Sequence, residues 1–282
     1  MDDAVAFVDV DWAGRRVLLE YGWVAPQRTQ RPLVVFLHEG LGSLPMWKGF
    51  PALLCDALDA RGLVFSRPRN GRSTALPRSE RWAPDYMHQA AASGLPAFLR
   101  AVGVDPYADP PWLLGHSDGA SIGLLHAAAF PEAVAGLVLL APHVFVEPVS
   151  LASIEAARQA FLATDLRERL ARYHLAPDEA FWGWNDIWLD PAFRNWNIEV
   201  ALASIRVPVL AVQGCEDEYG TLAQVHRIAA AVPATRVVVL EECRHSPHKD
   251  QPARLIEEVA RFFETPGRPR TGSSEDRHTA DH

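Results

Sequence analysis

Short, continuous runs of apolar residues recur along this chain from residue 33 onward, separated by segments with helical spacing. Strands that are buried on both faces of a parallel sheet have this texture, because neither face alternates with polar residues. We predict such strands at 33–37, 63–66, 112–114, 136–140, 207–212 and 236–240. Helices are predicted between them near 47–61, 86–102, 118–130, 221–232 and 251–264. This order predicts a doubly wound α/β fold.

The beginning of the chain has a different pattern. Residues 4–10 and 15–24 alternate apolar and polar side chains around Ala13-Gly14, which predicts an antiparallel hairpin that starts the sheet. With this hairpin, we expect a mostly parallel sheet of about eight strands.

The strand and helix rhythm is interrupted once, between Pro142 and Ile205. Helical spacing is evident there in residues 152–173, but no buried strand accompanies it. We therefore predict a helical cap at 142–205, inserted between two parts of an α/β core at 1–141 and 206–264. Residues 265–282 are rich in Gly, Pro, Ser, Arg and Asp without periodicity, which predicts a disordered tail.

Composition excludes several classes of protein. A formal charge of −8, with only Arg67, Arg69 and Arg72 as a basic cluster, does not predict a nucleic-acid partner. We find no signal-peptide pattern and no apolar run of membrane-spanning length, so a cytoplasmic protein without a membrane partner is expected. The three cysteines are too few and too scattered for a disulfide framework or a zinc site, and we expect buried free thiols.

The strongest chemical signal is the segment Gly115-His116-Ser117-Asp118-Gly119. It follows a predicted strand and precedes a predicted helix, which is the setting of a nucleophile elbow. The flanking glycines relieve crowding in a sharp turn that lifts the Ser117 hydroxyl above the sheet, and the helix start offers free N–H groups to a negative charge. We predict Ser117 as a nucleophile.

A serine nucleophile needs a histidine base and a carboxylate that orients the histidine. An acidic loop follows the strand 207–212, and within it we choose Asp217, with Glu216 and Glu218 as competitors. A loop after the next strand carries His245, our candidate base, with His248 as the alternative. A solvated acidic loop and surface histidines are the plain structural alternatives.

The candidates follow along the chain in the order Ser, acid, His, which is the order found in α/β-hydrolases. The chain resembles this superfamily over nearly its whole length, up to about Phe263. The loop after the strand 33–37 begins His-Gly in that family and supplies a second oxyanion N–H, but here Glu39 occupies the glycine position. The resemblance implies the N–H groups of Gly40 and Asp118 as the oxyanion donors, with Leu41 as the alternative to Gly40. Glu39 is interpreted as a structural or solvent-facing residue, with a functional carboxylate near the pocket mouth as the alternative.

The predicted cap is rich in aromatic residues, among them Trp182, Trp184, Trp188 and Trp196. We expect most of these rings to pack the cap onto the core and one or two to face a substrate. The residues that we predict to contact substrate are Leu41, His116, Trp182 and Trp188.

These features predict a serine hydrolase that cleaves a carboxylic ester or thioester of a hydrophobic or aromatic small molecule, without a metal or organic cofactor. Two alternatives remain open: a carbon–carbon bond hydrolase of an aromatic ring-cleavage product, and a ligand-binding protein without catalysis on the same fold. The oligomeric state also remains open, a homo-oligomer included.

Overall fold

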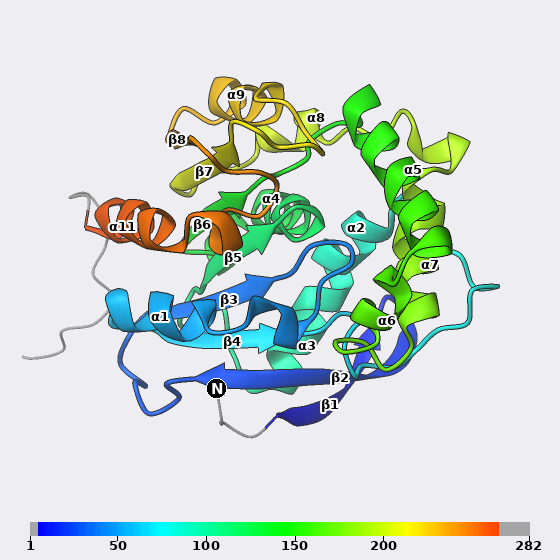
Figure 1. The fold of residues 1–282 in the computed structure, drawn as a ribbon. Helices are drawn as coiled ribbons and strands as arrows, with labels where there is room; N and C mark the ends of the chain where they lie inside the picture. The colour runs from blue at the N-terminus through cyan, green and yellow to red at the C-terminus, as the bar shows by residue number, and fades with distance from the viewer. Residues whose placement is uncertain (1–4, 265–282) are drawn as a thin grey trace, which may run out of the picture.

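A single sheet of eight strands organises the structure, a computed structural model that describes residues 5–264 (Figure 1). The strands follow the order β1-β2-β4-β3-β5-β6-β7-β8 across the sheet. Their bounds are β1 (Ala6–Trp12), β2 (Arg15–Val24), β3 (Leu33–Leu37), β4 (Arg61–Phe65), β5 (Trp112–His116), β6 (Gly136–Leu140), β7 (Val209–Gly214) and β8 (Thr235–Leu240).

The first two strands form the expected hairpin. β1 pairs antiparallel with β2, and the turn residues Ala13 and Gly14 both have positive φ, 55° and 80°. β2 is antiparallel to β4, whereas all remaining neighbours are parallel. The prediction of a mostly parallel, eight-stranded α/β sheet is confirmed.

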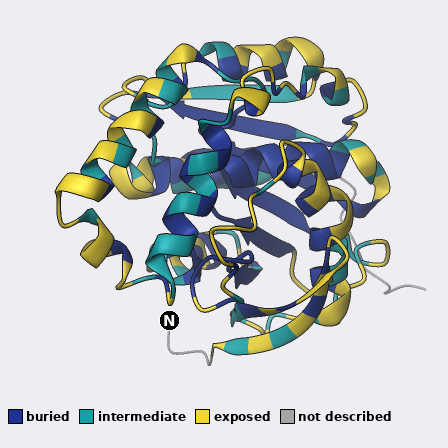
Figure 2. Ribbon diagram, turned by 90° about the vertical axis from the view of Figure 1, so that its right-hand side faces the viewer, coloured by how far each residue is buried: buried dark blue, intermediate teal, exposed yellow. Residues whose placement is uncertain are grey.

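Helices cover both faces of the sheet, so its central strands are buried (Figure 2). On one face, α1 (Phe50–Ala57) packs beside α11 (Pro252–Phe263). On the other face lie α3 (Leu95–Ala101), α4 (Asp118–Ala129) and α9 (Ala223–Ala231). The shorter elements are η1 (Leu44–Trp47), α2 (Tyr86–Gln89), η2 (Ala90–Gly94), η3 (Pro131–Ala133) and α10 (Pro247–Asp250). The strands β3 to β7 therefore carry apolar side chains toward both layers.

The segment between β6 and β7, predicted as a cap, is helical. It contains α5 (Pro148–Ala163), α6 (Leu166–Leu170), α7 (Pro177–Trp188), η4 (Pro191–Phe193) and α8 (Glu199–Leu202). The first three helices lie together beyond the carboxyl ends of β3 and β4 (Figure 1). The last, α8, packs instead against α4 and α9 on the sheet.

Three sequence expectations need correction. The single helix expected at 86–102 is divided into α2, the π-turn η2 and α3, because Pro96 has no N–H to donate to the preceding turn. The helical pattern in 152–173 belongs to two helices, which separate at Thr164. Cys55 and Cys243 are buried free thiols as expected, but Cys215 is exposed.

The tail predicted at 265–282 lies outside the described residues. Among residues 5–264, no helix combines the length and the apolar character needed to cross a membrane.

Candidate active site

Ser117 lies at a strained turn between β5 and α4. Its φ of 52° and ψ of −118° are unfavourable for a residue with a side chain. The neighbouring glycines explain how the chain can turn so sharply. A Cβ atom on Gly119 would lie 2.0 Å from the carbonyl oxygen of Leu37, and one on Gly115 would lie 2.4 Å from that of Gly119. The backbone therefore has the geometry of a nucleophile elbow.

The structure brings Asp217 and His245 together. Asp217 follows β7, His245 follows β8, and the distance from His245 Nδ1 to Asp217 Oδ1 is 2.8 Å. Because a carboxylate only accepts, Nδ1 donates, and Nε2 is left as the basic nitrogen. Glu218 contacts His245 differently, by accepting a hydrogen bond of 3.2 Å from its backbone N–H.

The Asp217 carboxylate is held in its ionised form. Its side chain is 1% exposed, and burial alone would raise its pKa. The hydrogen bond and charge of His245, together with the Tyr219 N–H at 2.8 Å, outweigh burial and lower the pKa of Asp217. Gln213 Nε2 donates to the second carboxylate oxygen at 2.7 Å. Both oxygens are thus engaged, so the carboxylate cannot rotate away from His245.

The ring of His245 lies beside the elbow. Its centroid is 5.1 Å from that of His116, the residue before Ser117, and 5.8 Å from that of His143. The Tyr219 ring lies 4.7 Å from the same imidazole, tilted by 41°. The carboxyl ends of β5, β7 and β8 therefore place the nucleophile, acid and base candidates in one region.

The two residues proposed to supply the oxyanion donors, Gly40 and Asp118, lie next to each other. A Cβ atom built on Gly40 would be 2.9 Å from Asp118 Oδ2 and 2.1 Å from Cδ1 of Trp184. Only glycine fits at position 40. Asp118 is the first residue of α4, so its N–H is one of the free donors at a helix start.

His38 and Arg67 hold the loop that carries Gly40. His38 Nδ1 donates to the carbonyl of Glu39 at 2.6 Å, and its Nε2 accepts the backbone N–H of Arg67 at 3.0 Å. The Arg67 guanidinium donates to the same Glu39 carbonyl at 2.8 Å. Burial and the positive charge of Arg67 lower the pKa of His38 far below its ordinary value, so the ring is neutral, as this pattern requires.

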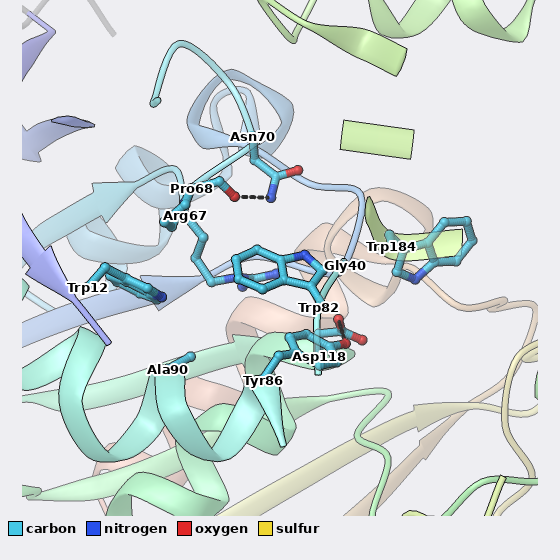
Figure 3. A pocket seen from close by; sticks show the side chains of 10 residues that line it. All are labelled: Trp12, Gly40, Arg67, Pro68, Asn70, Trp82, Tyr86, Ala90, Asp118 and Trp184. Carbon is cyan, nitrogen blue, oxygen red and sulfur yellow. Dashed lines mark hydrogen bonds between the residues drawn. The ribbon is translucent and has the colours of Figure 1, made fainter. Parts of the chain in front are cut away.

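The Asp118 side chain forms a second buried network, which reaches into the helical segment. Its carboxylate accepts hydrogen bonds from the Tyr86 hydroxyl at 2.5 Å and from Trp188 Nε1 at 3.2 Å. Burial raises the pKa of Asp118, although Arg67 opposes the shift. Asp118 and Tyr86 line a narrow cavity together with Gly40, Trp82 and Trp184 (Figure 3).

The four residues predicted to contact substrate do not line this cavity. Trp182 packs under the Arg78 guanidinium, 3.9 Å from its ring centre, and not at the cavity. Trp188 is buried and donates a hydrogen bond to Asp118. His116 is buried against the loop of His245. Leu41 is partly buried against Phe161, Leu170 and Phe181.

Sequence reasoning missed three residues at the site. Trp184 covers Gly40, but in the sequence it was only one of several cap tryptophans. His143 could have been found, because it follows β6 at the same sheet edge as Ser117. Tyr86 carries no local signal, since its partner Asp118 is 32 residues away in the chain.

Comparison with known proteins concerns the family and the fold. Residues 34–258 match the sequence model of the "Alpha/beta hydrolase family". No curated protein sequence matches significantly. Among solved structures, VinJ is similar with a TM-score of 0.70 at 23% identity, covering 93% of this chain and 98% of VinJ.

Two esterases show the same fold. An esterase from Thermogutta terrifontis has a TM-score of 0.70 at 18% identity, with 92% of this chain and 98% of that chain covered. The esterase RhEst1 from Rhodococcus sp. ECU1013 has a TM-score of 0.67 at 21% identity, with 95% and 100% covered. At such identities the likeness concerns the fold, whereas the sequence match spans most of the chain. The protein is therefore a member of the alpha/beta hydrolase family.

Proposed function

We propose that this protein is a serine hydrolase that cleaves a carboxylic ester or thioester through an acyl-enzyme on Ser117. The observation that carries the proposal is the 2.8 Å contact between His245 Nδ1 and Asp217, at the sheet edge where Ser117 occupies a positive-φ elbow. A histidine with its Nδ1 hydrogen directed to a buried carboxylate has its Nε2 available to take a proton from a serine hydroxyl.

Acylation then proceeds in two proton transfers. His245 Nε2 accepts the hydroxyl proton as Ser117 Oγ bonds to the substrate carbonyl carbon, and the N–H groups of Gly40 and Asp118 stabilise the resulting oxyanion. The imidazolium, stabilised by Asp217, gives the proton to the leaving alcohol or thiol as its bond to carbon breaks. Water repeats the sequence on the acyl-enzyme, and the acid and free Ser117 are released.

We propose a hydrophobic or aromatic small molecule as the substrate. The cavity beside Gly40 and Asp118 is bordered by the rings of Trp12, Trp82 and Trp184, which favour flat apolar groups. The two esterases named above support ester chemistry by their shared fold. We also propose that the protein is located in the cytoplasm.

A fluorophosphonate probe tests the nucleophile. The wild-type protein is expected to be labelled at neutral pH, and Ser117→Ala and His245→Ala are expected to lose labelling. Ser121→Ala is the matched control and should keep labelling. Ser121 is buried like Ser117, but it lies on α4 and its hydroxyl donates to the His143 carbonyl at 2.6 Å. A folded wild-type protein that is not labelled, or labelling that persists in Ser117→Ala, contradicts the proposal.

A substrate panel then separates the reaction classes. Nitrophenyl esters, acyl-CoA thioesters and dienone acids are compared by kcat/KM with the same protein. The proposal expects turnover of esters or thioesters, whereas turnover of dienone acids alone would identify a carbon–carbon bond hydrolase.

A further inference from the structure

Behind the proposed triad lies a buried group of charged residues that the reaction itself does not use. His116, at the end of β5, is 1% exposed, and its ring lies 4.9 Å from His248 and 5.1 Å from His245 between centroids. Trp47 closes the same space, 6.5 Å from His116. His116 therefore lies beneath the loop that carries His245.

Both nitrogens of His116 face groups that only accept hydrogen bonds. Nε2 lies 2.7 Å from the backbone carbonyl oxygen of His245, so Nε2 donates. Nδ1 lies 3.4 Å from Glu39 Oε2. A bare Nδ1 would repel an ionised carboxylate, so one further proton must lie between His116 and Glu39.

The surroundings of Glu39 place this proton on the histidine. The Lys249 ammonium lies 3.6 Å from Glu39 Oε1, and the Glu39 side chain is 16% exposed. Burial would raise the pKa of Glu39, but Lys249 and His116 outweigh it and hold the pKa well below its ordinary value. Glu39 is thus ionised, and the proton between the two side chains lies on His116 Nδ1, which faces Glu39 in an ion-pair contact rather than a hydrogen bond. His248, the other ring in contact with His116, is kept neutral because burial lowers its pKa far below the ordinary value.

The contacts of Glu39 are not needed to build its own loop. His38 and Arg67 already hold that loop through backbone carbonyls, as described above. The loop of His245 has another support, because Asp250 accepts from the Arg244 N–H at 2.9 Å. What Glu39 adds is a link through His116 to the carbonyl of His245, whose N–H is held by Glu218 on the other side.

We infer that Glu39 is a positioning residue for His245, acting through His116. The Glu39–His116 ion pair fixes the His245 backbone and thereby the direction of the imidazole toward Ser117. This inference rests on the proposed function, since it assigns a task within the same triad.

Glu39→Leu tests the inference, because leucine cannot pair with His116. The expected result is a fall of about tenfold in kcat and in the rate of fluorophosphonate labelling, with KM nearly unchanged, because a misplaced base slows the chemical step. Glu39→Gln should recover most of the rate, since its amide can still donate to a neutral His116 Nδ1.

A double-mutant cycle separates positioning through His116 from a direct effect. If Glu39 acts through His116, the variant E39L/H116L is no slower than H116L alone. Glu258→Gln is the control: Glu258 is a buried carboxylate far from Glu39 in sequence, pairs with Arg254 at 2.7 Å on α11, and its loss should lower thermal stability with unchanged kcat.

The outcomes distinguish the two proposals. Wild-type protein without labelling overturns the serine hydrolase function itself. Labelled wild type with an equally fast Glu39→Leu, or additive effects in the cycle, overturns only the role of Glu39. Should Glu39→Leu fail to fold, nitrogen-15 NMR of the wild-type protein gives the answer: a His116 ring with one unprotonated nitrogen at pH 7 contradicts the ion pair.

Discussion

At the scale of single residues, the contacts of the Asp217 carboxylate distinguish it from the two other candidate acids beside it. Asp217, Glu216 and Glu218 are adjacent, but Glu216 is exposed and Glu218 is half-buried against the His245 backbone. Of the three, only Asp217 contacts the His245 ring, through Oδ1, while its Oδ2 accepts from Gln213. The charge that stabilises an imidazolium is therefore fixed at one atom.

Asp217→Asn is expected to lower kcat by about 10⁴-fold while KM and the melting temperature change little. The asparagine amide keeps the shape but can donate to Nδ1, which favours the tautomer with its hydrogen on Nε2, the form that cannot accept the Ser117 proton. Ester hydrolysis under saturating substrate measures the effect. Glu216→Gln, the same change at the exposed neighbour, should retain wild-type kcat, and equal losses in the two variants would argue against Asp217.

Ser117, Asp217 and His245 could be identified as candidates from the sequence, because each follows a predicted strand and the three occur in the order Ser, acid, His. The tryptophans had no such marker. On a helix, positions 182 and 184 are about 160° apart, whereas 184 and 188 lie within about 40°. Trp184 and Trp188 thus share the face that meets Gly40 and Asp118, but this follows only once residues 177–188 are known to be the helix α7.

At the scale of elements, α4 depends on its close approach to β3. Gly119 lies against the carbonyl of Leu37, while one turn later Gly123 has only ordinary contacts, the nearest being Leu37 Cδ1 at 3.7 Å from a built Cβ. The first glycine is required by contact with backbone, which cannot move aside. The second glycine is tolerated rather than required.

Gly119→Ala and Gly123→Ala are therefore expected to have opposite effects. Alanine at 119 forces α4 away from β3, and we expect a loss of about 3 kcal/mol in the free energy of unfolding. Alanine at 123 restores helix propensity and should stabilise by up to about 1 kcal/mol. Urea unfolding measures both, and similar effects of the two variants would contradict this description of α4.

Element prediction succeeded where a pattern is local. Strand positions were correct because apolar runs mark them, but β5 extends through Gly115 and His116, which pair with Leu139 and Leu140 on β6. Ladder pairing is a tertiary property, so a glycine and a histidine gave no strand signal. The division of 86–102 by η2 likewise depends on Pro96 and on the packing of Gly94 against Trp12.

At the scale of the whole molecule, several histidines are buried in neutral form. Burial, aided by the nearby His245, lowers the pKa of His143 to about 3, and burial lowers that of His174 to about 4. In the unfolded chain these groups take up protons below their ordinary pKa of 6.5, whereas in the folded protein they do not. Each therefore makes stability fall as the pH drops from 6.5 toward its folded pKa.

His143→Gln is expected to reduce this acid sensitivity. Between pH 7 and pH 5, the wild-type free energy of unfolding should fall by about 2 kcal/mol more than that of the variant, because 1.5 pH units below the ordinary pKa correspond to that amount. Comparing the two proteins removes the contributions of other groups, including Asp118, whose raised pKa acts in the opposite direction. Identical pH dependence in urea unfolding would show that His143 is not held neutral.

Two indoles of α7 contact the two residues whose N–H groups are the proposed oxyanion donors: Trp184 lies on Gly40, and Trp188 donates to the side-chain carboxylate of Asp118. Indole emission responds to nearby charge and to solvent. If Ser117 is acylated as proposed, the emission of these two indoles is expected to change with acylation, and stopped-flow fluorescence can follow it without any added label.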